Sequence, residues 1–149
     1  MEDRAILDQV NIVAGDIGAS AAFYRLLGVE VPNGEPPWDA HHRSVSTSDG
    51  AAIDLDSTQF AAVWDTGWAD GRTGVVLGLR VESREAVDRV HAAVVAAGHH
   101  SEQDPYDALW GARYAVVADP DGNAVGIMSP IDDARRTPPP DPDSLSSRQ

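Results

Sequence analysis

The sequence repeats one series of structural landmarks, and this repeat is the feature that most constrains the fold. In each half, a helix-capping residue is followed by a glycine at the expected helix end and by a second glycine in a later turn. The pairs are Asp16 and Ser83, Gly28 and Gly98, and Gly50 and Gly122, which lie 67, 70 and 72 residues apart. Short polar side chains cap helix N-termini, whereas glycine favours helix C-termini and tight turns. The repeat therefore predicts two modules with the same supersecondary structure.

Hydrophobic periodicity predicts the elements of each module. In the first half, it predicts a strand over 5–13, a helix over 17–27, and strands over 29–31, 41–48 and 51–56. In the second half, it predicts a strand over 74–81, a helix over 83–97, and strands near 99–103, 110–117 and 123–128. The turn DPDGN at 119–123 joins the last two strands as a hairpin. We therefore expect an α+β fold of two βαβββ modules, at about 5–56 and 74–129.

The length of 149 residues and a hydrophobic content of 42% predict one domain, over residues 1–131. The linker over 57–73 suits a short helix or an irregular segment equally well. The Pro- and Ser-rich tail over 132–149 is expected to be disordered, because its composition offers little apolar surface to bury.

Composition excludes several classes of function. With 24 acidic and 11 basic residues, the net charge is −13, which argues against nucleic acid or an anionic membrane as a partner. All the basic residues are arginines and cysteine is absent, so neither a Schiff-base lysine nor a cysteine nucleophile is available. The N-terminus has no apolar run typical of a signal peptide or a membrane span. We expect a cytoplasmic protein.

The chain resembles the vicinal oxygen chelate superfamily, which includes glyoxalase I, extradiol dioxygenases, fosfomycin-resistance enzymes and bleomycin-binding proteins. The resemblance is carried by residues 7–16 (LDQVNIVAGD), 22–28 (AFYRLLG), 97–98 (AG) and 119–123 (DPDGN). It extends from about Ile6 to Ser129. The resemblance implies a mixed sheet that curls around a cavity, and a homodimer. It identifies a fold more specifically than an activity.

The resemblance also implies where a metal ion would be held, namely by the first and last strands of each module. The corresponding residues are Gln9, Asp54, Val76 and Gly126. Val76 and Gly126 carry no donor atom, and the residues beside them are also apolar. Two oxygen ligands do not hold a transition metal against water. We therefore expect no metal and no other cofactor, which argues against glyoxalase I chemistry and ring-cleaving dioxygenation.

Strand alternation predicts which residues face a cavity. One face of the strands is apolar and is expected to meet the helices: Val10, Ile12, Ile53, Leu55, Leu77, Leu79, Val125 and Ile127. The opposite face is mixed: Gln9, Asn11, Asp54, Asp56, Val76, Gly78, Arg80, Gly126 and Met128. Polar groups interspersed with small residues are typical of a ligand cavity. The alternative is a sheet face open to solvent.

His42 and Asp54 are the candidate catalytic residues. Adjacent residues of a strand point to opposite faces, so only one of His41 and His42 can face the cavity, and we expect it to be His42. Paired with Asp54 across neighbouring strands, His42 would act as a general base or as a ligand anchor. The alternatives are a surface histidine, or a metal site of unusual composition built from His41 or His42 with Asp54 and Asp56.

Four tryptophans stand in or beside loops, where they would stack on a planar ligand, fix the linker to the core or lie in a dimer interface. The predicted ligand-binding residues are Gln9, Trp38, His42, Asp54, Asp56, Trp64, Trp68, Arg80, Trp110 and Tyr114. The leading hypothesis is a metal-independent protein of the glyoxalase/bleomycin-resistance type that sequesters an aromatic or natural-product-like small molecule. The alternative is a glyoxalase-like enzyme of the isomerase or lyase type, which uses His42 or Asp54 for proton transfer on a small carbonyl substrate.

Overall fold

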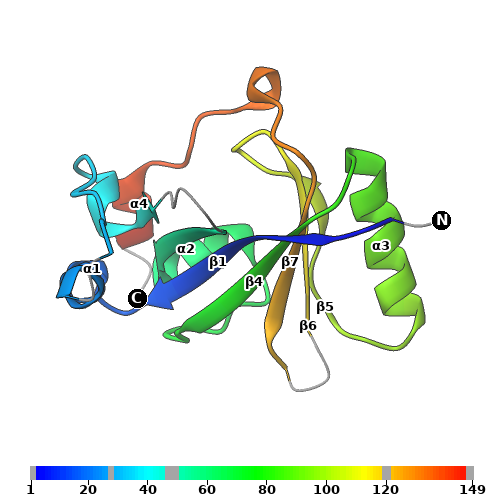
Figure 1. Cartoon of the computed structure of the whole chain (residues 1–149), viewed down its shortest axis with the longest axis horizontal. Coiled ribbons are helices and arrows are strands. Elements are labelled where there is room, and N and C mark those ends of the chain that lie inside the picture. The colour runs from blue at the N-terminus through cyan, green and yellow to red at the C-terminus, as the bar shows by residue number, and fades with distance from the viewer. Residues whose placement is uncertain (1–2, 27–28, 46–50, 119–121, 147–149) are drawn as a thin grey trace.

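The strands of the chain form one mixed, curled sheet (Figure 1). The computed structural model describes residues 3–26, 29–45, 51–118 and 122–146. The sheet order is β2-β3-β1-β4-β7-β6-β5. The bounds are β1 (Ile6–Ala14), β2 (His42–Val45), β3 (Ala52–Ser57), β4 (Gly74–Arg80), β5 (Ser101–Asp107), β6 (Arg113–Ala118) and β7 (Ala124–Met128). No pairing joins β2 to β5 in the described part of the chain, so the sheet stays open there.

The two predicted modules meet along β1 and β4, which pair antiparallel at the centre of the sheet. On the outer side of each, a parallel partner follows: β3 beside β1, and β7 beside β4. The register places Asn11 of β1 opposite both Asp54 and Val76. This arrangement gives the α+β fold that the repeat predicts.

Two helices cover the outer face of the sheet at its two ends. Helix α1 (Ile17–Leu26) packs over β3, and its first turn is capped by Asp16, whose Oδ1 accepts from the backbone N–H of Ala19 at 2.9 Å. Helix α3 (Arg84–Ala96) packs over β5, β6 and β7, and the Ser83 hydroxyl caps it by accepting from the N–H of Ala86. Both predicted caps are confirmed.

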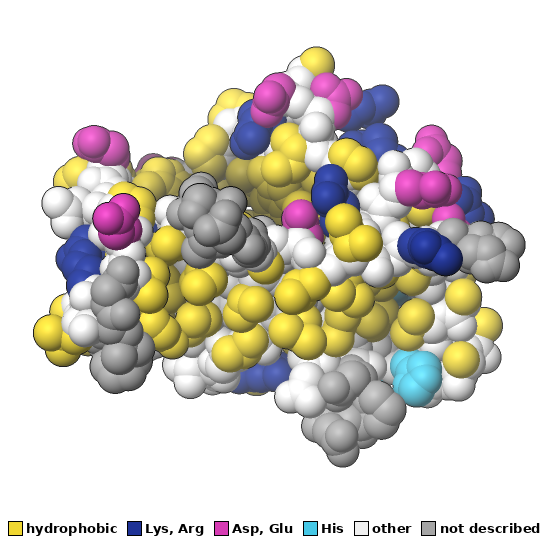
Figure 2. Space-filling model, viewed as in Figure 1, with side chains coloured by type: hydrophobic (Ala, Val, Ile, Leu, Met, Phe, Trp, Pro, Cys, Tyr) yellow, Lys and Arg dark blue, Asp and Glu magenta, His cyan; other side chains and the backbone are white. Residues whose placement is uncertain are grey.

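The middle of this outer face is less covered than the sequence predicts. Leu77, which was expected to meet a helix, is 44% exposed, and its neighbour Val75 is 51% exposed. Leu7, beside them on β1, is 55% exposed. Apolar side chains form a band across this face in Figure 2. The expectation of helix cover is wrong at Leu77, because α1 and α3 pack over the two flanks of the sheet.

The linker between the modules forms helix α2 (Thr58–Trp64), with Ser57 as its N-cap. This helix lies on the concave side of the sheet, and its Phe60 and Trp64 join the larger core cluster. Of the two alternatives for this segment, the short helix is therefore confirmed for Thr58–Trp64.

Residues 29–31, where the sequence predicts a strand, are absent from the sheet, so the described part of the first module contributes one strand fewer than that of the second. The backbone of this segment bonds back toward α1: the N–H of Val29 donates to the carbonyl of Tyr24, and the carbonyl of Val31 accepts from the Arg25 guanidinium. These bonds turn the segment toward α1, and it forms no strand pairing. The prediction of a strand here is wrong.

The tail departs from the expected disorder over 132–146. It contains a 3₁₀-helix η2 (Asp133–Arg135) and a short helix α4 (Pro142–Ser146), and it arches from the end of β7 toward α2 (Figure 1). Leu145 is fully buried in the same core cluster as Trp64. This one buried side chain anchors a segment whose average composition favours disorder. We call residues 130–141 the strap.

The turn glycines agree with their predicted roles where the structure describes them. Gly98 after α3 and Gly122 before β7 have φ values of 96° and 88°, in the left-handed region. Gly28, Gly50 and the Asp-Pro-Asp segment at 119–121 lie outside the described residues. In the described parts of the chain, no helix has the length and the apolar character needed to cross a membrane.

Candidate functional site

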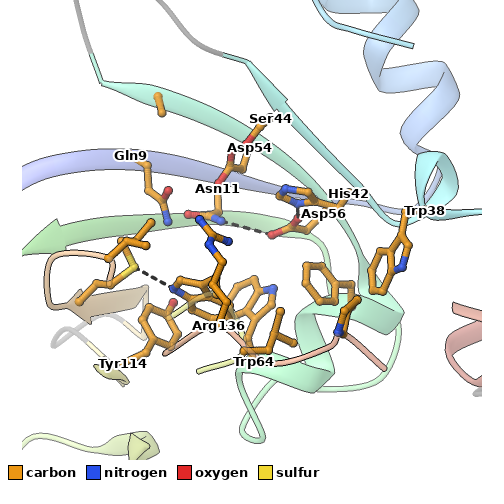
Figure 3. Close-up of a pocket in the computed structure, with 17 residues that line it drawn as sticks. Gln9, Asn11, Trp38, His42, Ser44, Asp54, Asp56, Trp64, Tyr114 and Arg136 are labelled. Carbon is orange, nitrogen blue, oxygen red and sulfur yellow. Dashed lines mark hydrogen bonds and ion pairs between the residues drawn. The ribbon is translucent and has the colours of Figure 1, made fainter. Parts of the chain in front are cut away.

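A cavity of about 430 Å³ opens on the concave side of the sheet. Strands β1, β2 and β3 form one wall, whereas β6, α2, the loop between β5 and β6, and the strap contribute to the others. The lining residues are Gln9, Asn11, Trp38, His42, Ser44, Ala52, Asp54, Asp56, Phe60, Trp64, Leu109, Trp110, Tyr114, Met128, Ile131, Arg136 and Pro139. Figure 3 shows the polar residues of the strands on one side, facing Trp64 and Tyr114 on the other.

The centre of the polar wall is a hydrogen-bonded series formed by His42, Asp56 and Asn11. Nδ1 of His42 lies 2.5 Å from Oδ1 of Asp56, and Nδ2 of Asn11 donates to Oδ2 of Asp56 at 3.2 Å. The β2–β3 register places His42 opposite Asp56 and Ser44 opposite Asp54. The expected pairing of His42 with Asp54 is therefore wrong. Asp54 instead accepts a hydrogen bond from the Ser44 hydroxyl at 2.5 Å.

The charges on this wall are set by burial and by these bonds. Burial alone would lower the pKa of His42, but the hydrogen bond and charge of Asp56, with the charge of Asp54, raise it above its ordinary value. The pKa of Asp54 is raised chiefly by burial, and the negative charge of Asp56 adds to this effect. Asp56 itself is 1% exposed. A buried carboxylate beside a protonated imidazole is the arrangement in which both charges are stabilised.

His42 and His41 face opposite sides of the chain, as the alternation predicts. His42 lines the cavity, and because its Nδ1 is bonded to Asp56, Nε2 is the ring nitrogen left for a ligand. His41 is buried, with its Nδ1 2.9 Å from the hydroxyl of Ser57. The two histidines therefore do not meet at one site.

Asn11 leaves one polar atom without a partner. The residue is only 7% exposed, and its Nδ2 donates to Asp56. Its Oδ1 is buried and accepts no hydrogen bond among the described residues. Such an acceptor is costly unless a ligand or water satisfies it.

The opposite wall is aromatic. Tyr114 stands at its centre, with the ring centroids of Trp110 and Trp64 at 5.2 and 6.2 Å and near-perpendicular ring planes. Trp38 packs edge-on against Phe60 at 5.1 Å, beside His42. The indole N–H of Trp110 is 3.1 Å from the sulfur of Met128, which holds this ring in place. This wall offers ring surface against which a planar molecule can pack.

Two predicted ligand-binding residues lie elsewhere. Trp68 is 5% exposed within the core, where its indole N–H donates to the carbonyl of Arg72, so it holds the linker in place. Arg80 lies at the end of β4 and forms an ion pair with Asp8 at 3.3 Å. The β1–β4 pairing shifts its register between Leu7 and Gln9, at Asp8, the partner of Arg80. The remaining eight line the cavity: Gln9, Trp38, His42, Asp54, Asp56, Trp64, Trp110 and Tyr114.

The positions that the resemblance implies for metal ligands do not suit a metal. Val76 is fully buried in the core. A side chain at Gly126 would begin 2.6 Å from the hydroxyl of Tyr114, so the phenol fills the space that a ligand at this position would need. Gln9 and Asp54 remain as the only donors of the four. Among the described residues, no group of three or more His, Cys, Asp or Glu side chains is placed to hold a metal ion.

Several cavity residues fall outside the predicted site. Asn11 and Met128 lie on the predicted mixed face but outside the predicted site. Arg136 and Pro139 belong to the tail for which the sequence predicts disorder, and Ile131 lies directly before that tail. One local signal in the tail was available: Asp141 before Pro142 is a typical helix start, and Oδ1 of Asp141 accepts from the N–H of Asp143. The leucine that follows, Leu145, is the apolar residue that such a helix buries.

Comparison with solved structures shows the same fold in proteins of low sequence identity. A structure described as an NAD-dependent benzaldehyde dehydrogenase from Legionella pneumophila matches with a TM-score of 0.61 and 20% identity, over 81% of this chain and 96% of that chain. The Mn(II)-bound glyoxalase from Novosphingobium aromaticivorans matches with a TM-score of 0.55 and 23% identity, over 85% of this chain and 38% of that one. An extradiol ring-cleaving dioxygenase from B. fuscum matches with a TM-score of 0.61 and 16% identity, over 87% of this chain and 34% of that chain. At these identities the likeness shows the fold alone.

A search of curated proteins finds no match. The family model that matches is described as the Glyoxalase/Bleomycin resistance protein/Dioxygenase superfamily, and it covers residues 6–127. This range contains β1 to β6 and all of β7 except its last residue, Met128. The family match and the fold agree, and the chain belongs to the Glyoxalase/Bleomycin resistance protein/Dioxygenase superfamily.

Proposed function

We propose that this protein binds a planar organic molecule in its cavity without the help of a metal ion. The observation that carries the proposal is the pairing of the two walls: polar strands on one side, and Trp64, Trp110 and Tyr114 on the other. A cavity of about 430 Å³ is in the range of small-molecule sites. The fit of Tyr114 against Gly126 supports the metal-free part of the proposal.

The test is a titration of tryptophan fluorescence with a panel of aromatic and polycyclic compounds. A compound that enters the cavity is expected to quench the fluorescence and to raise the melting temperature, because ligand binding to the folded state stabilises it. Trp110→Phe is expected to reduce the quenching, since Trp110 lines the cavity. Trp68→Phe is the matched control and is expected to leave it unchanged, since Trp68 is buried behind Trp64 and is not among the lining residues. The proposal fails if no compound in the panel changes either signal.

A second candidate function is proton transfer by His42, and the hydrogen bond between His42 and Asp56 specifically favours it. In this role, Nε2 of neutral His42 accepts a proton from a carbon beside a carbonyl group of the ligand, and the imidazolium then returns the proton to the substrate. Asp56 holds the imidazole by accepting from Nδ1 and stabilises the cation that forms. No other group needs to supply or remove electrons.

Proton transfer is tested by incubating the protein in D₂O with a panel of small carbonyl compounds and following the loss of the C–H signal by NMR. A substrate is expected to exchange this proton for deuterium at a rate that falls by about 10²-fold or more in His42→Gln, in keeping with the contribution of a general base. His99→Gln, at an exposed histidine after α3, is the control and is expected to exchange normally. Equal exchange in wild type and His42→Gln would exclude this role, while leaving ligand binding intact.

A further inference from the structure

Arg136 brings a guanidinium group into the cavity from the strap. Among the described residues, it is the one arginine that lines the cavity. Its Nε donates to Oδ1 of Asp133 at 2.6 Å, which orients the group. Nη1 and Nη2 have no hydrogen-bonding partner among the described residues. In Figure 3, Arg136 lies between the polar strands and the aromatic wall.

The strap is bonded to the protein on both sides of Arg136. The N–H of Asp132 donates to the carbonyl of Gly111, and the N–H of Thr137 donates to the carbonyl of Leu109, each at 3.0 Å. Gly111 has a φ of 92°, and a Cβ at this position would lie 2.3 Å from the carbonyl oxygen of Asp132. The strap and the loop between β5 and β6 are thus in close contact. The backbone that carries Arg136 is therefore held at the cavity.

The opposite wall presents acceptors. Oδ1 of Asn11 is buried and has no partner among the described residues, and its orientation is fixed because Nδ2 donates to Asp56. The carboxylates of Asp54 and Asp56 already accept from Ser44, His42 and Asn11. The buried acceptor without a partner on this wall is therefore Oδ1 of Asn11, and a ligand with a hydrogen-bond donor would satisfy it.

The two walls together define a ligand with two different ends. We propose that the cavity selects planar compounds that carry a carboxylate, which Arg136 binds through Nη1 and Nη2, and a hydroxyl or amino donor, which Oδ1 of Asn11 accepts. The inference rests on the proposed function and specifies its ligand class. Although Arg136 is paired with Asp133 through Nε, its Nη1 and Nη2 offer two charge-assisted donors to a carboxylate, the geometry for which arginine is suited.

The test uses three probes that differ in one group each: para-hydroxycinnamate, its amide, and cinnamate, which lacks the hydroxyl. Dissociation constants are measured by calorimetry for wild type, Arg136→Met and Arg135→Met. Arg135 is the matched control, because it is the adjacent arginine, pairs with Asp132 and is absent from the cavity lining. Both variants change the net charge equally.

For wild type, para-hydroxycinnamate is expected to bind about tenfold or more tightly than its amide, and more tightly than cinnamate. In Arg136→Met, the preference for acid over amide is expected to disappear, whereas Arg135→Met keeps it. Equal binding of acid and amide by wild type would overturn the inference, as would the same loss in both variants. If none of the three probes binds while other planar compounds quench cavity tryptophans, the inference fails and the proposed function stands. If no planar compound binds at all, the proposed function fails as well.

Discussion

At the scale of single residues, the structure turns a set of candidate side chains into one hydrogen-bonded series. His42, Asp56 and Asn11 come from three neighbouring strands, and the register alone decides which of them meet. Asp56 is almost completely buried and accepts from both of the others. The charge of His42 therefore depends on Asp56 more than on the adjacent Asp54, which is bonded to Ser44.

Replacing Asp56 by Asn is expected to lower the pKa of His42. In the wild type, burial lowers this pKa, and the hydrogen bond and charge of Asp56 oppose that effect. In the variant the charge of Asp56 is lost, so the lowering by burial is opposed less. The measurement is an NMR titration of the His42 ring. Ser44→Ala is the control, because Ser44 bonds Asp54 and leaves the contact between His42 and Asp56 intact.

The same pairing predicts how stability varies with pH. Because the folded state raises the pKa of His42, the stabilisation from this pair is complete below the ordinary pKa of histidine and is lost as pH rises through the raised value. In Asp56→Asn this part of the pH dependence is expected to disappear. An unchanged His42 titration in Asp56→Asn would contradict the assigned pair.

At the scale of secondary-structure elements, a second buried contact joins the end of α2 to β5. Asp65 follows the last turn of α2 and has no exposed surface, and Glu102 lies beside it in β5. Burial, a hydrogen bond with Glu102 and the charge of Glu102 raise the pKa of Asp65 to about 7. Asp65 therefore keeps its proton in the folded state at pH values at which the same carboxyl group in the unfolded chain has lost it.

Asp65→Asn is expected to stabilise the protein at pH 8. The folded state of the wild type holds a proton on Asp65 up to about pH 7, so the stabilisation from this contact is present at low pH and falls as pH rises toward 7. The amide of Asn can donate to Glu102 and accept from the N–H of Gly67 at every pH. We expect a gain on the order of 1–3 kcal/mol at pH 8, measured by urea unfolding, and a flatter pH profile.

Asp70→Asn, at an exposed position after α2, is the control for the change in net charge and is expected to have little effect. If Asp65→Asn is less stable than the wild type at pH 8, the buried carboxyl pair does not destabilise the folded wild type at that pH, and the prediction is wrong.

The strap is the other element whose position can be tested. Gly111→Ala places a Cβ 2.3 Å from the Asp132 carbonyl, so the strap must move. Trypsin is then expected to cleave after Arg135 and Arg136 faster than in the wild type, as followed by mass spectrometry. Gly98→Ala is a matched control: Gly98 also has a positive φ, 96°, but a Cβ there meets nothing within 4 Å. If trypsin cleaves both variants equally faster than the wild type, backbone strain alone explains the effect. That result would contradict the close contact at Gly111.

The sequence predicts the elements of this fold better than their neighbours in space. The caps Asp16 and Ser83 and the glycines Gly98 and Gly122 are local signals, and the structure confirms them. The pairing of His42 with Asp56 depends on a register that no local pattern determines. The presence of Arg136 in the cavity lining depends on the ordered tail. That order depends on Leu145, one buried side chain in a segment whose average composition favours disorder.

At the scale of the whole molecule, the outer face of the sheet remains a candidate interface. Leu7, Val75 and Leu77 are each about half exposed and lie on adjacent strands between α1 and α3. Contiguous apolar surface of this kind is typical of an interaction site. The homodimer that the resemblance implies stays a prediction, and we expect this face to form it.

Leu77→Glu is expected to convert a dimer to a monomer, because it buries a carboxylate in the apolar contact. Light scattering coupled to size-exclusion chromatography measures the mass. Val95→Glu, at a residue of α3 that is 42% exposed, is the control and is expected to stay dimeric. A monomeric wild type would contradict the predicted dimer, and a dimeric Leu77→Glu would contradict the assigned face.

The central claim is that the cavity, and not another part of the molecule, holds a planar ligand. The most direct measurement is a proton–nitrogen NMR spectrum of the four tryptophan indoles during titration with a compound that quenches their fluorescence. Trp38, Trp64 and Trp110 line the cavity, whereas Trp68 donates to Arg72 inside the core. The account predicts that the first three signals shift with the ligand and that the Trp68 signal stays in place. A shift confined to Trp68, or no shift at any indole, would contradict it.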